Sequence, residues 1–245
     1  PRSDIKNTVD GKEHQIFLKD YFPVDVHANE AVFDIQYGNV TRPTYANTSW
    51  DFAKFEVCHH KWLDVSEEGY GVSVFNDCKY GVSVRGSNIG LSMLKSPVYP
   101  NPEADKEHHE FTYSIYPHRG SWKEAGTVAR AYEFNNPMTA VVKENEGGNL
   151  NPEYSFLRVD QENVVIETAK MAEQGEELIV RLYECCNKRS RVTLTCGEAI
   201  AEAAECNLME EKDIPAEHTE HTAVFDMKPY EIKTIKITWK NRPSK

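Results

Sequence analysis

The sequence contains no run of about 18 or more apolar residues, so we expect no helix that spans a membrane. It is also short of positive charge, with 28 Lys and Arg against 39 Asp and Glu and a formal net charge of −11. A negative surface repels phosphate groups and anionic lipids, so we expect neither nucleic acid nor a membrane surface as a partner. Neutral ligands meet no such penalty.

Two further features are missing: a disulfide-like or zinc-like spacing of the six cysteines, and a secretory signal. We interpret the cysteines as reduced thiols of a cytoplasmic protein. Cys185 and Cys186 are adjacent at an expected strand end, where successive side chains point to opposite faces, which disfavours a bond between them. Because the sequence starts at Pro1 without a signal segment, we expect it to be part of a longer chain.

Apolar and polar residues alternate with a period of two in many short segments, as one-sided antiparallel sheets require. Glycine- and proline-containing turn signals separate them, which is typical of sandwiches. The clearest alternating segments are 33–37, 72–74, 82–84, 111–115 and 235–239. The sequence therefore predicts an all-β fold.

Two segments depart from this pattern. Residues 122–132 place Ala125, Val128, Ala129 and Tyr132 at helical spacing, which predicts a short helix. Residues 197–211 are rich in Ala and Glu, which favour helix. We leave that segment open, with strand as the preferred interpretation.

The best domain boundary is the polar segment Lys143–Pro152, which contains two glycines and ends in Asn-Pro. It predicts a large β-sandwich over residues 1–145 and a small one over 146–245. The second part has the size and strand number of an immunoglobulin-like domain.

The loop Asn76–Gly81 places an amide, a carboxylate, an amine and a phenol directly after an apolar strand. Such groups exchange hydrogen bonds with sugar hydroxyls, and an aromatic ring covers the apolar face of a sugar. The same residues are also good turn formers. Both interpretations, ligand contact and turn, stay open on composition alone.

Three blocks carry a resemblance to a known family: Asn76–Gly81, Leu94–Pro97 and His109–Tyr113. They resemble the C-terminal β-sandwich region of glycoside hydrolase family 38 α-mannosidases, in the branch of cytosolic neutral mannosidases and bacterial homologues. The resemblance implies a large antiparallel sandwich of the galactose-mutarotase-like supersandwich type, followed by a small immunoglobulin-like sandwich.

The resemblance also implies a function. The intact enzyme would hydrolyse α-mannosidic bonds with retention, using an aspartate nucleophile and zinc that both belong to an N-terminal α/β domain. This chain would then be a scaffold that supplies loops to the sugar pocket. Its partners would be α-mannoside oligosaccharides and the α/β domain, with self-association left open.

The residues themselves agree with a non-catalytic part. His59-His60 and His108-His109-Glu110 are the densest histidine clusters, but no HExxH or CxxC spacing occurs, so we expect no metal bound by this chain. Neighbouring glutamates such as Glu67-Glu68 are no evidence for the paired carboxyls of a retaining glycosidase. We therefore assign no catalytic residue here and no cofactor to the chain itself.

We expect substrate contacts instead in the loops of the large sandwich, with Glu103 as a neighbouring candidate. Lys95 matches a position where relatives often carry Arg; Lys keeps the charge but loses the planar fork of Arg. The predicted substrate-binding residues are Asn76, Asp77, Lys79, Tyr80, Lys95 and Asp105.

Two other functions remain open. The chain could be an autonomous, non-catalytic carbohydrate-binding module on a β-sandwich, or a purely structural interaction domain. The tryptophans 50, 62, 122 and 239 could stack on sugars, but three of them lie within apolar patterns or beside expected strand ends, which favours packing.

Overall fold

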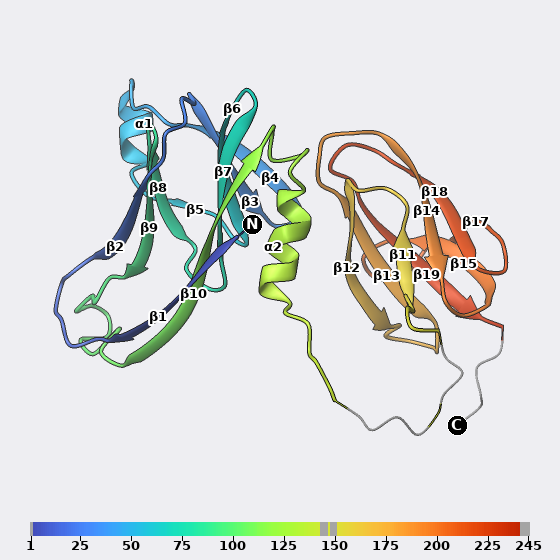
Figure 1. Ribbon diagram of the computed structural model, residues 1–245. Coiled ribbons are helices and arrows are strands. Elements are labelled where there is room, and N and C mark those ends of the chain that lie inside the picture. Colours follow the sequence, from blue (N-terminus) through green and yellow to red (C-terminus); the bar gives the residue numbers. More distant parts are fainter. Residues whose placement is uncertain (1, 143–146, 148–150, 241–245) are drawn as a thin grey trace. The chain divides into compact units, whose positions relative to one another are not determined.

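The computed structural model describes residues 2–142, 147 and 151–240 and confirms the predicted all-β architecture with antiparallel sheets. The chain forms two compact units, Pro1–Ala140 and Val141–Lys245, called unit 1 and unit 2 below (Figure 1). Most of the segment Lys143–Pro152, predicted as the boundary, lies outside the described residues. Each unit contains two sheets.

Unit 1 is built from a six-stranded and a four-stranded sheet. The six-stranded sheet has the order β1 (Ser3–Asp10), β10 (His108–Arg119), β7 (Tyr70–Asn76), β6 (Trp62–Glu67), β3 (Glu30–Ile35), β4 (Gly38–Pro43). The four-stranded sheet has the order β2 (Leu18–Pro23), β9 (Asn88–Leu94), β8 (Gly81–Arg85), β5 (Val57–Cys58). All pairings between neighbouring strands are antiparallel.

The central strand β7 is buried on both faces. Val72 and Val74 pack into the core between the sheets. On the other face Phe75 contacts Phe134 of helix α2 (Thr127–Asn135), with ring centroids 6.2 Å apart. Because both faces are covered, β7 has almost no exposed side chain after Tyr70.

Helix α2 confirms the helix predicted near residues 122–132, but it begins later. Gly126 caps it with φ +64°, a left-handed conformation that glycine adopts without strain, so the preceding residues form turns. A second helix, α1 (Ser49–Ala53), has no counterpart among the predictions. Thr48 and Asp51 form its capping box.

Unit 2 also consists of two sheets. The five-stranded sheet has the order β12 (Val164–Met171), β13 (Leu178–Glu184), β19 (Ile232–Trp239), β15 (Ile200–Cys206), β16 (Ile214–Pro215). The four-stranded sheet has the order β11 (Leu157–Val159), β14 (Ser190–Cys196), β18 (Thr222–Met227), β17 (Glu217–His218). Strand β15 confirms the preferred interpretation of residues 197–211 for its central part, whereas residues 207–211 form no strand.

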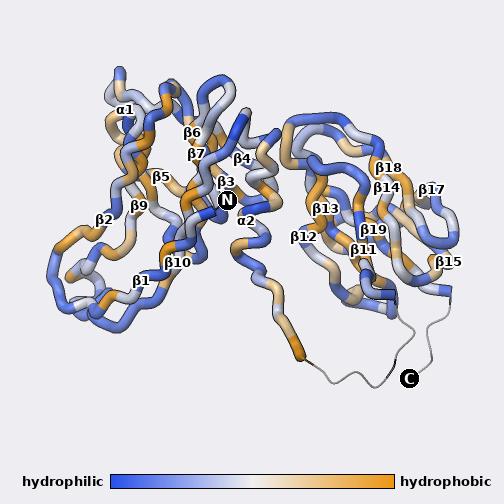
Figure 2. Tube along the Cα trace, viewed as in Figure 1, coloured by the Kyte–Doolittle hydropathy of each residue, from blue (hydrophilic) through white to orange (hydrophobic). Residues whose placement is uncertain are grey.

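The core of unit 2 is formed by alternating apolar side chains. Figure 2 shows hydrophobic and hydrophilic residues alternating along its strands. Leu182 of β13, Leu194 of β14 and Ile235 of β19 are fully buried in one cluster. Strand alternation thus explains how both sheets bury one face.

Candidate functional site

Asn76, the last residue of β7, is buried and anchors the loop that follows. Its Nδ2 donates to His59 Nε2 at 2.8 Å and to the carbonyl oxygen of His60 at 2.5 Å. Its Oδ1 accepts the backbone N–H of Lys79 at 2.7 Å. Every polar atom of the Asn76 amide is therefore used to shape the loop.

His59 completes this anchor as a neutral imidazole. It is fully buried, and burial lowers its pKa to about 3. Its Nε2 accepts from Asn76, so Nδ1 carries the hydrogen and faces the carbonyl oxygen of Tyr80 at 3.2 Å. A charged imidazolium would break this arrangement.

Asp77 and Tyr80 lie at the surface of the same loop. Asp77 Oδ2 accepts the backbone N–H of Thr112 on β10 at 2.8 Å, which ties the loop to the neighbouring strand. The Tyr80 ring is 47% exposed and meets the His60 ring edge-on, with centroids 5.2 Å apart. Both side chains keep a face towards solvent.

Asp105 organises the second predicted loop. Its Oδ2 accepts the backbone N–H groups of Lys95 and Ser96, each at 3.0 Å. The hydrogen bond from Lys95 is the main reason why the pKa of Asp105 is lowered, although partial burial acts in the opposite direction. Asp105 is thus held ionised at the corner that carries Lys95.

An open groove of about 480 Å³ joins the two loops in unit 1. Lys79, Lys95 and Asp105 line it, whereas Asn76 and Asp77 do not. Tyr80 is also absent from its lining. The groove residues are Phe17, Phe55, Glu56, Lys79, Gly81, Ser92, Met93, Leu94, Lys95 and Asp105.

The floor of this groove contains a charged network that the sequence did not reveal. Glu56 forms an ion pair with Lys19 of β2, and its Oε2 accepts from the Ser92 hydroxyl at 2.5 Å. Lys19 Nζ also donates to Ser83 Oγ at 2.7 Å. The only sequence signal was an aromatic residue next to a carboxylate at Phe55-Glu56, which is common in any protein.

Aromatic rings border the groove. Phe17 is 46% exposed and Phe55 66% exposed. Lys79 Nζ lies 4.7 Å from the centroid of the Phe111 ring, which holds this amine by a cation–π contact. Exposed rings beside carboxylate, hydroxyl and amine groups can bind a neutral, hydroxyl-rich ring such as a sugar.

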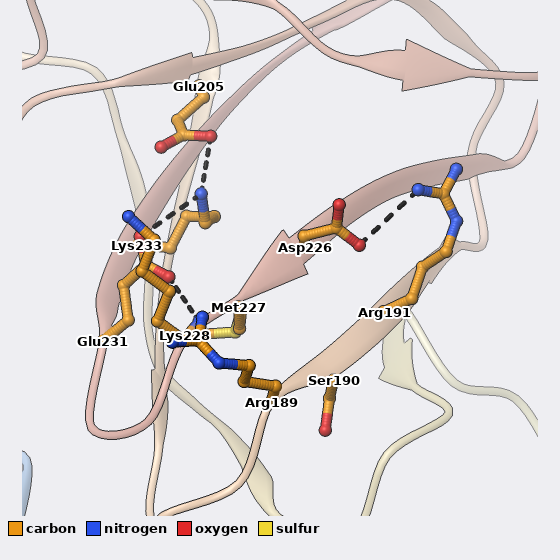
Figure 3. A pocket seen from close by; sticks show the side chains of 9 residues that line it. All are labelled: Arg189, Ser190, Arg191, Glu205, Asp226, Met227, Lys228, Glu231 and Lys233. Atoms are coloured by element: carbon orange, nitrogen blue, oxygen red, sulfur yellow. Dashed lines mark hydrogen bonds and ion pairs between the residues drawn. The ribbon is translucent and has the colours of Figure 1, made fainter.

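A second groove of about 630 Å³ lies in unit 2 and has a different chemistry (Figure 3). Lys233 Nζ contacts Glu205 at 2.6 Å and Glu231 at 3.6 Å, and Arg191 pairs with Asp226 at 3.5 Å. Most of its charges thus neutralise one another. No predicted site residue lies in it.

The described residues contain no group of three or more His, Cys, Asp and Glu side chains that could hold a metal ion. Among them there is also no helix long and apolar enough to cross a membrane.

The tryptophans predicted to pack do so in part: Trp62 contacts Trp122, with centroids 5.0 Å apart, whereas Trp50 is 79% exposed.

Comparison with known proteins gives matches in both units. The family model described as "Glycosyl hydrolases family 38 C-terminal domain" matches residues 1–103, and "Glycosyl hydrolases family 38 C-terminal beta sandwich domain" matches residues 163–235. A crystal structure of an alpha-mannosidase from Enterococcus faecalis V583 superposes with a TM-score of 0.81 at 20% identity, over 97% of this chain and 27% of that one.

Curated relatives extend the similarity. Alpha-mannosidase 2C1 of Homo sapiens is 43% identical over 205 residues, which are 82% of this chain and 19% of that protein. Alpha-mannosidase G of Dictyostelium discoideum is 36% identical over 96% of this chain and 22% of its own length. The chain thus spans about a fifth of the length of these relatives, and its matches show that it belongs to the C-terminal region of glycosyl hydrolase family 38.

Proposed function

We propose that this chain is the C-terminal β-sandwich region of an α-mannosidase that hydrolyses α-mannosidic bonds with retention. The observation that carries the proposal is the similarity of both units, in order along the chain, to family 38 C-terminal domains whose relatives are named alpha-mannosidases. The chemistry belongs in this proposal to an N-terminal α/β domain. This chain supplies a scaffold and one wall of the sugar pocket.

The groove of unit 1 is the proposed wall. Lys95 and Asp105 are placed to exchange hydrogen bonds with sugar hydroxyls, and Phe55 offers a ring to the apolar face of the sugar. Glu56 adds a carboxylate that Lys19 keeps in position. These groups contact the substrate directly in our proposal.

The remaining predicted residues have a supporting role in the proposal. Asn76 fixes the loop, and Asp77 ties it to β10, so that Lys79 reaches the groove. Tyr80 retains an exposed ring that can meet a longer oligosaccharide.

Zinc, which family resemblance implies, finds no fitting set of ligands among the described residues. In our proposal zinc is bound by the α/β domain. Asp105 Oδ2 accepts two backbone N–H groups and Glu56 pairs with Lys19, and these contacts hold both carboxylates in position for the sugar in our proposal.

We further propose a cytoplasmic location, α-mannoside oligosaccharides as ligands, and the α/β domain as the main partner. Cys58 and Cys78 are exposed thiols outside any disulfide, which suits a reducing compartment. Self-association of the whole enzyme is a further element of the proposal and is tested by its mass in solution.

The test compares this chain with the protein from its complete reading frame, using an aryl α-mannoside. We expect turnover with retention, read from the anomeric signal of the first product, in the longer protein only. Turnover by this chain after repurification, equal to that of the longer protein, would overturn the division of labour.

A second measurement separates this proposal from an autonomous carbohydrate-binding module. α-Mannobiose is titrated into this chain while backbone amide signals are recorded. Weak or absent binding is expected, because only one wall of the pocket is present. Saturable micromolar binding at the groove would favour the module.

A further inference from the structure

Two adjacent thiols lie side by side at the end of strand β13. The sulfur atoms of Cys185 and Cys186 are 3.7 Å apart, with Cys185 buried and Cys186 partly exposed. Our expectation that they point to opposite faces was wrong in geometry. The strand ends at Glu184, and the chain then turns through Asn187, whose φ is +61°, so strand alternation no longer applies.

The backbone holds both cysteines in this arrangement. Cys185 N–H donates to the carbonyl oxygen of Asn163 at 2.9 Å, and Cys186 N–H donates to Glu184 Oε1 at 2.8 Å. Glu184 is fully buried and also accepts from Asn163 Nδ2 at 2.8 Å and from Tyr230 N–H at 2.9 Å. The pair is therefore organised before any ligand arrives, which lowers the entropic cost of binding.

This geometry suits a shared ligand atom better than a disulfide. Adjacent Cα atoms are about 3.8 Å apart across a trans peptide, which is shorter than the roughly 4.4–6.8 Å of unstrained disulfides. By contrast, one atom with bonds of about 2.3 Å to sulfur holds two sulfurs roughly 3.3–3.8 Å apart at bond angles of about 90–110°. The observed 3.7 Å lies in that interval.

We propose that Cys185 and Cys186 form a two-sulfur binding site for a thiophilic metalloid, with trivalent arsenicals as the ligand class. Soft sulfur ligands select such centres over the hard cations that bind oxygen. A trivalent organoarsenical needs only two protein sulfurs, so the site is complete without a third side chain. This inference does not depend on the proposed mannosidase function.

The binding step balances without an oxidant. With phenylarsine oxide, two As–S bonds form and the bond from arsenic to oxygen breaks, while both thiol protons leave with the oxygen as water. Cys186 reacts first because it is the more exposed thiol. The pKa of Cys185 is raised mainly by its hydrogen bond with Cys186 and also by burial. Cys185 therefore forms the second As–S bond, which closes the chelate ring.

The chain provides matched single-thiol controls. Cys58 and Cys78 are exposed, and we expect each to react as a single thiol. They can form one bond to arsenic but not two. Excess monothiol displaces arsenic that is bound to a single protein sulfur. Arsenic that is bound to two protein sulfurs resists this displacement, because the second As–S bond forms within the same molecule.

The experiment titrates the full chain with phenylarsine oxide in excess monothiol and counts bound arsenic by intact mass. One arsenic per chain is expected, with release by a dithiol. Cys186→Ser and Cys185→Ser should each weaken binding by about 100-fold or more. The double variant Cys58→Ser/Cys78→Ser should bind as the unmodified chain does.

Two results would overturn the proposal: retention of bound arsenic in Cys186→Ser, or its loss in the Cys58/Cys78 double variant. Cys185 is buried, so Cys185→Ser could lower stability; Cys186→Ser, checked by its melting temperature, then decides. A third result would also contradict a preformed site. In it, the arsenic adduct forms only when the chain unfolds and Cys196 or Cys206 is labelled as well.

Discussion

The groove of unit 1 is lined by exposed aromatic rings, whereas most charged side chains that line the groove of unit 2 are paired with one another. In unit 1, Phe17 and Phe55 expose large parts of their rings beside Lys95. In unit 2, Lys233 and Arg191 are already paired with carboxylates across the groove. Covering exposed rings stabilises a complex by roughly 25 cal/mol per Å² of apolar area, whereas opening existing ion pairs costs free energy. Our proposal therefore assigns the sugar to the groove of unit 1.

The largest expected effect separates a buried charge network in unit 1 from an exposed ion pair in unit 2. Asp64 Oδ2 in unit 1 accepts from Ser73 Oγ and contacts His118 Nε2, both at 2.7 Å, in a buried cluster. Asp64→Ala removes the partner of a buried imidazole, so unit 1 should lose about 3–5 kcal/mol of stability. Urea unfolding, followed by residue-resolved amide signals, measures this loss.

The matched control is Asp226→Ala in unit 2, which removes an exposed carboxylate paired with Arg191. Its effect should stay within about 0.5 kcal/mol. Equal losses in the two variants would remove the contrast between a buried and an exposed charge network.

The second prediction concerns Asn76, whose amide is used entirely inside unit 1. Asn76→Ala leaves His59 and the N–H of Lys79 without their partner, and should cost roughly 2–3 kcal/mol. Asp77→Ala, which removes one exposed contact to Thr112, should cost less than about 1 kcal/mol. Chemical denaturation ranks the two; the reverse order would show that Asp77 is the anchor of the loop.

The third prediction sharpens the comparison of the grooves and rests on the proposed function. In the complete enzyme, Phe55→Ala and Asp105→Asn should each lower kcat/KM by about 10-fold to 100-fold, since contacts with the reacting sugar are lost. Glu231→Gln in the groove of unit 2 should leave kcat/KM unchanged. Steady-state kinetics with an aryl α-mannoside and melting temperatures for each variant provide the test.

The last prediction is a pH dependence of stability, with opposite signs at two histidines of unit 1. Burial disfavours charged His118, but the hydrogen bond and charge of Asp64 outweigh it and raise its pKa. Its stabilising contribution is therefore complete below about pH 6.5 and is lost as pH rises through the higher folded pKa. His118→Gln should abolish that loss in pH-dependent urea unfolding.

His59 behaves in the opposite way. Because its pKa is lowered to about 3, its contribution is complete above about pH 6.5 and is lost as pH falls towards 3. His59→Gln should flatten the acid side of the stability profile only. A variant that changes both sides equally would contradict the separate assignments.

Local patterns predicted the strands well, because alternation along β13 or β19 reflects which face is buried. They could not reveal that both faces of β7 are covered, since helix α2 follows it by some fifty residues. Asn76 was expected to face a ligand, whereas its side chain points inward to His59, a residue from another strand region. The sequence shows that Asn76 carries an amide, but it does not show in which direction that amide points.

The floor of the groove shows the same limit. Lys19 and Ser92 are directly opposite each other in the register of β2 and β9, and Glu56 joins them from the segment before β5. Only the pairing of distant strands brings these three residues together. Local sequence patterns therefore pointed to Lys79, Lys95 and Asp105, which line the groove, but not to Glu56, which also lines it.

The edges of unit 2 have a consequence for its behaviour at high concentration. Strands β16 and β17, which end the two sheets on one side, contain two residues each. Pro215 lacks a backbone N–H, and β17 is polar and exposed. Short edges with a proline or charged residue give a foreign strand too few groups to pair with. At these two edges unit 2 is therefore a poor template for the addition of a foreign strand.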